Sequence, residues 1–280
     1  MTKIFTPKYL EEALELLAEK HPPQPLAGGT DLLVIRKDEP ERFSSLMVLE
    51  KLQELSGIHK DNGRIRIGSF TTHADIEHSP VLKEYASVLS SAASEIGSVQ
   101  IRNRGTIGGN IINASPAGDL IPPLIALDAV FELHSSKAKR EVPAREFFLG
   151  PGKSVREPKE LLIAIHFTVP EARERGVFLK LGPRKAQAIS KVMLAAQGLV
   201  HHEAIEWIRI AIGAVAPTVI RAPQTEALLQ GTKLSPELIE EAKETVRREV
   251  SPITDIRSTE EYRHEVAGVL LQRALESILK

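Results

Sequence analysis

The chain has 280 residues, of which 42% are hydrophobic and 26% charged, with a formal net charge of -1. These values are typical of a globular protein with two or three compact units, and the near-zero charge argues against a general nucleic-acid-binding protein. No apolar run approaches the ~20 residues that span a bilayer, and the N-terminus lacks a secretory-signal layout, so a cytoplasmic protein is expected.

The absence of cysteine excludes disulfides, a cysteinyl link to flavin and cysteine-ligated iron–sulfur clusters within this chain. A redox role would therefore need a bound organic cofactor, and any iron–sulfur cluster would belong to a partner.

Three hydroxyl–proline pairs predict helix starts. Thr6-Pro7, Ser79-Pro80 and Ser235-Pro236 each place a capping side chain before a proline at the first helical position. Apolar spacing predicts one helix after Thr6, a second over 79–96 and two more over 235–249 and 259–279.

Alternating or continuously apolar stretches predict the strands. The predicted strands cover residues 64–70, 130–135, 160–169, 189–200 and 205–216. The last two form a predicted hairpin that turns at His201-His202-Glu203-Ala204. A solvated turn is preferred there to a metal-ligand cluster, because the spacing shows no metal-site geometry. A domain boundary is expected near 170–176.

The first segment with chemical character is LAGGTDL at 26–32. Gly28 and Gly29 allow positive φ and a close approach of a ligand to the backbone. Successive amide N–H groups in such a turn bind anionic oxygen, and Thr30 adds a hydroxyl donor. The alternative is a simple turn capped by Thr30 or Asp31.

The second segment is RGTIGGNIINASPAGD at 104–119. Its glycines and closely spaced polar side chains suit a phosphate-bearing ligand, which would satisfy several buried polar groups at once. Asp119 could accept hydrogen bonds from ribitol hydroxyls, or it could cap a helix. The alternative for the whole segment is a Gly/Asn-rich surface loop.

Neither glycine segment matches the Walker pattern or a GxGxxG motif that follows a strand. A classical Rossmann dehydrogenase is therefore disfavoured, and a flavin site built from two separate loops is the remaining interpretation.

At these residues the sequence resembles the FAD-binding medium subunit of the xanthine dehydrogenase and carbon monoxide dehydrogenase family. The resemblance covers almost the whole chain. The matching pieces are LAGGTDLL at 26–33, QIRNRGTIGGNIINASPAGDLIP at 100–122, ELLIAIHF at 160–167, FLKLGPRKAQAISKV at 178–192 and GAVAPTVIRA at 213–222.

The resemblance implies an α+β fold with a vanillyl-alcohol-oxidase-type FAD-binding domain of two α+β subdomains. A C-terminal domain with a three-stranded antiparallel sheet and helices would follow. The expected limits are 1–56 and 57–172 for the two subdomains, and 173–280 for the C-terminal flavoprotein domain.

The resemblance also implies positions for the cofactor. Residues 27–31 and the 106–110 segment would hold the pyrophosphate, Leu162 would lie near adenine and Lys180 near the flavin. No acid–base catalyst is expected, whereas Lys180 or Arg184 would stabilise negative charge on reduced flavin. The expected cofactor-binding residues are Leu26, Ala27, Gly28, Gly29, Thr30, Asp31, Leu32, Thr106, Ile107, Gly108, Gly109, Asn110, Asn113, Ser115, Asp119, Leu162 and Lys180.

The function implied is that of an oxidoreductase subunit with non-covalent FAD and no metal of its own. Electrons would arrive from [2Fe-2S] clusters on an iron–sulfur subunit, beside a molybdopterin subunit, and leave to NAD, a quinone or oxygen. A dimer of heterotrimers is implied. NAD is left open as the electron acceptor, because residues 184–187 (RKAQ) are basic or neutral. The animal relatives carry an acidic residue in this loop. The alternatives are a free-standing FAD reductase of the same superfamily and a non-catalytic flavin-binding module.

Overall fold

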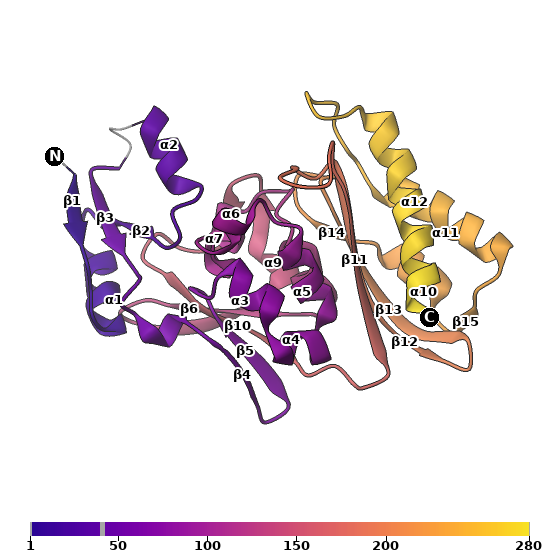
Figure 1. Cartoon of the computed structure of the whole chain (residues 1–280), viewed down its shortest axis with the longest axis horizontal. Helices are drawn as coiled ribbons and strands as arrows, with labels where there is room; N and C mark the ends of the chain where they lie inside the picture. The colour runs from indigo at the N-terminus through magenta and orange to yellow at the C-terminus, as the bar shows by residue number, and fades with distance from the viewer. Residues whose placement is uncertain (1, 40–42, 280) are drawn as a thin grey trace.

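The three larger β-sheets follow one another along the long axis of the molecule in chain order (Figure 1). The structure, a computed structural model, describes residues 2–39 and 43–279. None of the helices within these residues is long and apolar enough to cross a membrane.

The N-terminal sheet is small and parallel, in the order β1-β3-β2. Leu14 and Leu17 of α1 are buried in a cluster that also contains Met47 of β3. The elements of this part are β1 (Lys3–Phe5), α1 (Leu10–Ala18), β2 (Gln24–Leu26), α2 (Leu32–Asp38), β3 (Ser45–Val48) and a 3-10 helix, η2 (Gln53–Leu55).

The helix start expected at Thr6-Pro7 is wrong. The first helix begins at Leu10, and no hydroxyl side chain caps it. Instead, the Glu12 carboxylate accepts a hydrogen bond from the Lys8 backbone N–H at 2.8 Å. A glutamate one turn into the helix thus replaces the hydroxyl cap that the sequence motif predicts.

The central sheet is antiparallel, in the order β4-β5-β10-β6-β7, and β10 lies at its middle. The predicted strands at 64–70, 130–135 and 160–169 are all confirmed within two residues. The strands of this part are β4 (Ile58–Asp61), β5 (Arg64–Gly68), β6 (Val130–His134), β7 (Lys139–Pro143) and β10 (Leu161–Thr168), with a separate pair β8 (Phe148–Gly150) and β9 (Lys153–Ser154).

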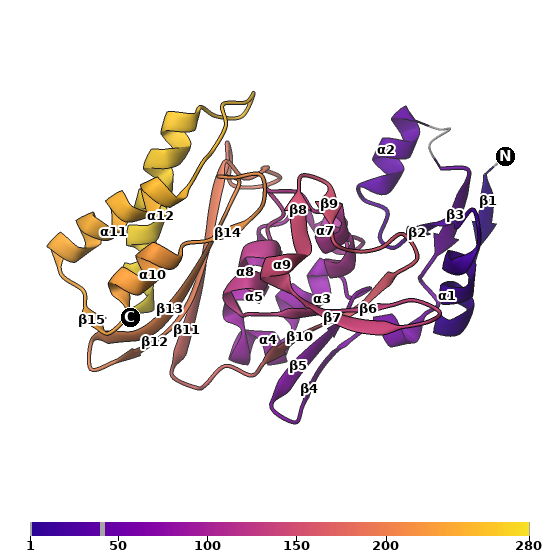
Figure 2. The same ribbon diagram turned by 180° about the vertical axis from the view of Figure 1, so that it is seen from behind.

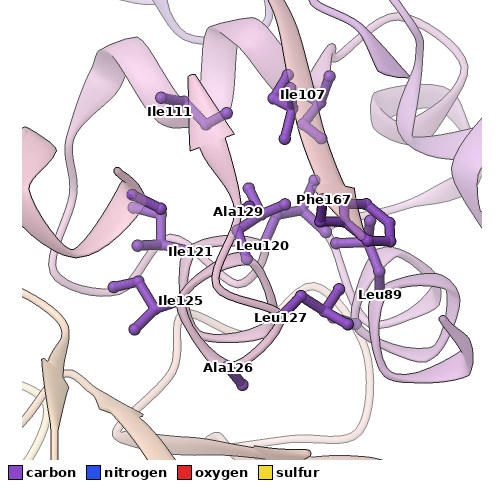
Figure 3. Close-up of a cluster of buried hydrophobic side chains, with 14 of the residues drawn as sticks. Leu89, Ile107, Ile111, Leu120, Ile121, Ile125, Ala126, Leu127, Ala129 and Phe167 are labelled. Atoms are coloured by element: carbon purple, nitrogen blue, oxygen red, sulfur yellow. The ribbon is translucent and has the colours of Figure 1, made fainter. Parts of the chain in front are cut away.

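Short helices pack over one face of this sheet (Figure 1). Ile107 and Ile111 of α7 (Ile107–Asn113) point into the same apolar cluster as Ile121 and Ile125 of α8 (Ile121–Ala126) (Figure 3). The helices are α3 (His73–His78), α4 (Pro80–Tyr85), α5 (Ser87–Ser94), α6 (Val99–Arg102), α7 (Ile107–Asn113), α8 (Ile121–Ala126) and α9 (Ala144–Phe147).

Residues 79–96 form two helices, where one was expected. Ser79 and Pro80 do start a helix, and Ser79 accepts a hydrogen bond from the Leu82 N–H. The helix ends at Tyr85, because Ala86 leaves helical geometry at φ -146° and ψ 52°. This break lets Leu82 and the apolar side of α5 both face the central core.

The C-terminal part pairs three long antiparallel strands with two two-residue strands at the β13 edge (Figure 2). One face of the sheet packs on α5 and α8, α10 and α12 pack on the other, and α11 packs on these two helices. The elements are β11 (Glu174–Leu181), β12 (Val192–His201), β13 (Ala204–Gly213), β14 (Ile220–Arg221), α10 (Pro223–Leu229), β15 (Thr232–Lys233), α11 (Pro236–Glu249) and α12 (Glu260–Ile278).

The predicted hairpin and both C-terminal helices are confirmed. Strand β12 ends at His201 and β13 begins at Ala204, with positive φ at His202 and Glu203 in the turn. Ser235 caps α11 and Pro236 is its first residue, as expected. Strand β11 begins at Glu174, inside the stretch expected to be a boundary, so the domain limits stay a prediction.

Candidate functional site

The two glycine segments meet at a cavity of about 610 Å³ between the N-terminal sheet and α7. This volume is within the range of small-molecule and cofactor sites. The cavity is lined from the first part of the chain by Gln24, Pro25, Leu26, Ala27, Gly28, Gly29, Thr30, Asp31, Leu32, Ile35, Phe43 and Leu49. Its other walls are Ser69, Phe70, His73, Ile96, Ile101, Thr106, Gly108, Gly109, Asn110, Ile112, Asn113, Gly152, Arg156, Glu160, Leu161 and Leu162.

The first glycine loop connects β2 to α2 and packs directly on the second. A Cβ atom on Gly28 would lie 1.8 Å from the Arg104 carbonyl oxygen, so only glycine permits this approach. Gly29 adopts φ +74°, the left-handed region that favours glycine. Within the described residues, the N–H groups of Gly28, Gly29 and Thr30 have no acceptor. These free donors face a cavity and suit an anionic ligand.

The second glycine loop leads into α7. Thr106 caps this helix, and its Oγ1 accepts a hydrogen bond from the Gly109 N–H at 3.1 Å. A Cβ on Gly108 would lie 2.6 Å from the Ser69 carbonyl oxygen. A Cβ on Gly109 would meet only Thr106 Oγ1, at 3.2 Å. Gly108 therefore serves packing, whereas Gly109 leaves its side of the helix open to the cavity.

Two polar atoms of the cavity wall are buried and lack a partner in the described part of the chain. They are Oδ1 of Asn110 and Nδ1 of His73. Burial, and then the charge of Arg102, lowers the pKa of His73 from 6.5 to about 4, so this ring is neutral at pH 7. Buried polar atoms normally find hydrogen-bond partners, which a polar ligand in this cavity would supply.

Asp119 and Lys180 form a buried ion pair at one side of this region. Lys180 Nζ lies 2.6 Å from Asp119 Oδ2 and 2.9 Å from the Glu95 carbonyl oxygen. The other carboxylate oxygen of Asp119 accepts a hydrogen bond from Ser190 Oγ at 2.6 Å. Burial raises the pKa of Asp119, and the charge of Lys180 opposes that rise. Asp119 caps no helix, because α8 begins at Ile121 after Leu120.

Most of the expected cofactor-binding residues line the one cavity, but four do not. Ile107 points into the core (Figure 3), and the Ser115 hydroxyl accepts a hydrogen bond from the Ala117 N–H. Asp119 and Lys180 bind each other beside the cavity. The residues that line it are Leu26, Ala27, Gly28, Gly29, Thr30, Asp31, Leu32, Thr106, Gly108, Gly109, Asn110, Asn113 and Leu162.

Several cavity residues were not predicted from the sequence. β5 ends at Gly68, so both Ser69, which was predicted to lie within the strand at 64–70, and His73 follow the strand, and no local motif marked either residue. Arg156 and Glu160 come from the turn before β10, and no local motif distinguished them from surface charges. The Arg184 side chain, expected at the flavin, donates hydrogen bonds to the Gln187 carbonyl within its own loop.

Comparison with known proteins yields two adjoining matches. Residues 1–171 match the family described as the FAD binding domain in molybdopterin dehydrogenase. Residues 178–278 match the CO dehydrogenase flavoprotein C-terminal domain.

Individual relatives match over nearly their full length. A putative xanthine dehydrogenase FAD-binding subunit of Escherichia coli (strain K12) is 33% identical over 95% of this chain and 92% of its own. A nicotinate dehydrogenase FAD-subunit of Eubacterium barkeri is 31% identical over 99% of this chain and 96% of its own. A solved carbon monoxide dehydrogenase from Hydrogenophaga pseudoflava superposes with a TM-score of 0.95 at 30% identity, covering 99% of this chain and 96% of that chain.

Proposed function

Because the chain belongs to the family of FAD-binding subunits of the xanthine and carbon monoxide dehydrogenase type, we propose that it passes electrons from partner iron–sulfur clusters through FAD to NAD or another acceptor. The observation that carries this proposal is the cavity between the two glycine loops, whose free amides and unpartnered polar atoms suit a diphosphate-linked cofactor.

FAD fits the residues that surround this cavity. Its diphosphate needs several donors at close range, and the N–H groups of Gly28, Gly29 and Thr30 are free to act as those donors. The ligand must pass close to the backbone, which Gly109 permits because it has no side chain on that wall. Asn110 and His73 each present a buried polar atom that a partner on the cofactor would satisfy.

The sequence resemblance supports an orientation for the cofactor within the cavity. Leu162 would lie against adenine, residues 27–31 and 106–110 would bind the diphosphate, and Asn113 would lie along the ribityl or the diphosphate portion. The isoalloxazine ring would then occupy the end near Ile96 and Ile112, next to the C-terminal sheet.

The bound cofactor would supply the redox chemistry, since the sequence contains no cysteine. The chain binds and orients it: the glycine loops fix the diphosphate, and the apolar residues Ile96, Ile101 and Ile112 exclude water from their side of the cavity. Lys180 stays a candidate for stabilising negative charge, through space, because its ammonium is held at a fixed position by Asp119 and Glu95.

The partners follow from the same proposal. An iron–sulfur subunit would deliver electrons and a molybdopterin subunit would oxidise the organic substrate, since this chain has no cysteine to hold a cluster. The match of residues 178–278 to a flavoprotein C-terminal domain favours this reading over a free-standing reductase. The proposed assembly is a dimer of heterotrimers.

The test is electron transfer in the assembled complex. The chain would be produced together with its two partner subunits and mixed anaerobically with a substrate of the molybdenum subunit. Bleaching of the flavin absorbance, followed by NAD reduction, is the expected result. Full reduction of the iron–sulfur centres with no change at the flavin would overturn the proposal.

A further inference from the structure

We infer that Arg156 is the cation that binds the AMP half of FAD and makes the site selective for a dinucleotide over FMN. This inference rests on the proposed orientation of FAD, with adenine at the Leu162 end of the cavity. Arg156 is the only lysine or arginine among the described residues of the cavity wall.

The turn before β10 is built to present this side chain. The Glu160 carboxylate receives two hydrogen bonds from Arg140, at 2.6 and 2.8 Å, and a third from the Glu157 backbone N–H at 2.7 Å. Arg140 also donates to the Val155 carbonyl oxygen at 2.8 Å. Bidentate arginine–carboxylate pairs fix geometry as well as charge, so this pair makes the 155–160 turn rigid.

Arg156 itself uses only one of its terminal nitrogens within the chain. Its Nη1 donates to the carbonyl oxygens of Glu157 and Glu160, at 3.0 and 2.8 Å. Its Nε and Nη2 have no partner in the described residues. The guanidinium is therefore anchored at one corner while its two other nitrogens remain available, the geometry that binds two oxygens of a phosphate.

The charge of Arg156 is poorly compensated by the protein. The Glu160 carboxylate of the same turn is already neutralised by Arg140. Burial lowers the pKa of Arg156, with only the charge of Glu160 opposing that shift. A half-buried cation without its own counter-ion is costly, and the negative charge of the AMP half of FAD would reduce this cost.

The position of Arg156 explains why the AMP half is the ligand. Gly152 and Leu162 line the same wall, and the chain runs from Glu160 directly into Leu161 and Leu162 of β10. FMN has no AMP half, so it cannot reach this guanidinium if its ring occupies the opposite end. Selectivity for the dinucleotide then comes from the Arg156 end of the cavity.

The test compares nucleotide binding by cofactor-stripped chains, measured by calorimetry. The variants are Arg156→Gln and Arg156→Lys, with Arg145→Gln as the matched control, because Arg145 is exposed and outside the cavity. We expect Arg156→Gln to weaken the binding of ADP and FAD about tenfold or more and to change FMN binding less than twofold. Arg156→Lys should retain part of the ADP affinity, since it keeps the charge.

Two results would overturn the inference. One is ADP and FAD affinity within twofold of wild type in folded Arg156→Gln protein. The other is an equal loss of FMN and FAD affinity, which would indicate general damage to the cavity. Circular dichroism and melting temperature verify folding. Failure of the wild-type chain to bind FAD would instead contradict the proposed function, so the two failures are distinguishable.

Discussion

The Lys180 ammonium lies 2.6 Å from the Asp119 carboxylate, and both side chains are at most a tenth exposed. Asp119 precedes α8 of the central part, whereas Lys180 belongs to β11 of the C-terminal sheet. Ser190 binds the other oxygen of the same carboxylate, so one aspartate holds both ends of the 182–190 loop. The pair therefore joins the C-terminal sheet to the central part of the chain, and charge balance explains its burial.

Removing the lysine should destabilise the fold strongly. Lys180→Met leaves the Asp119 carboxylate buried with no counter-charge, which typically costs about 3–5 kcal/mol. Urea unfolding of the cofactor-free chain measures the loss. The double variant Lys180→Met/Asp119→Asn should recover much of it, because no charge remains buried. If the double variant loses as much free energy of unfolding as the two single variants lose together, this coupling is contradicted.

The Lys180→Met defect should also depend on pH. Burial already raises the pKa of Asp119 in the folded state, and loss of Lys180 removes the charge that opposes this rise. An acid whose folded pKa is raised contributes stability below its unfolded pKa and loses it as pH rises through the folded value. The difference in the free energy of unfolding between wild type and Lys180→Met should therefore become smaller toward acid pH. A difference in the free energy of unfolding that does not change with pH would show that charge burial does not cause the loss of stability in Lys180→Met.

His73 should make the fold less stable in acid. Its pKa falls from 6.5 to about 4 in the folded state, so folding favours the neutral ring. The stability it contributes is complete above pH 6.5 and is lost as pH falls toward 4, by at most ~3 kcal/mol. His73→Gln should reduce the change in the free energy of unfolding between pH 6.5 and pH 4. His78→Gln, at an exposed histidine on the same helix, is the matched control.

The glycines of the site should separate into two classes. Gly28→Ala would force a Cβ to 1.8 Å from the Arg104 carbonyl oxygen, so the loops must part, at a cost of about 3 kcal/mol or more. Gly109→Ala meets only Thr106 Oγ1 at 3.2 Å, so it should change stability by less than about 1 kcal/mol. Gly109→Ala should nevertheless weaken FAD binding at least tenfold, because the methyl group enters the cavity. Thermal melts and FAD titrations of both variants distinguish the classes; equal stability of the two would refute the distinction.

Thr106 should contribute as a helix cap. Thr106→Ala removes the acceptor for the Gly109 N–H and should cost about 1 kcal/mol, whereas Thr106→Ser should retain most of the stability. Chemical unfolding of the two variants is the measurement. If serine fails to rescue, the methyl group rather than the hydroxyl is the stabilising part.

The sequence was informative where local chemistry decides structure. The hairpin at 201–204 and the caps at Ser79 and Ser235 were predicted because turn and cap preferences are local. The Thr6-Pro7 cap failed because Glu12, one turn later, supplies the acceptor instead.

The rest of the site depends on contacts between distant segments. Gly28 was expected to admit a ligand, but its missing side chain admits the Arg104 carbonyl, 76 residues away in the chain. Arg156 was not predicted at all, because a single arginine in a turn has no pattern and only the fold brings it to the cavity wall. The ion pair of Asp119 and Lys180, 61 residues apart, is equally invisible without the sheet packing.

Binding of FAD by the isolated chain is the direct test of the proposed cofactor site. The purified protein would be stripped of cofactor, verified as folded by circular dichroism and titrated with FAD while flavin fluorescence and visible absorbance are recorded. We expect saturable binding of one FAD for each chain, with ADP as a competitor. Folded protein with Gly28, Gly29, Gly108 and Gly109 intact that shows no saturable binding of FAD would contradict it.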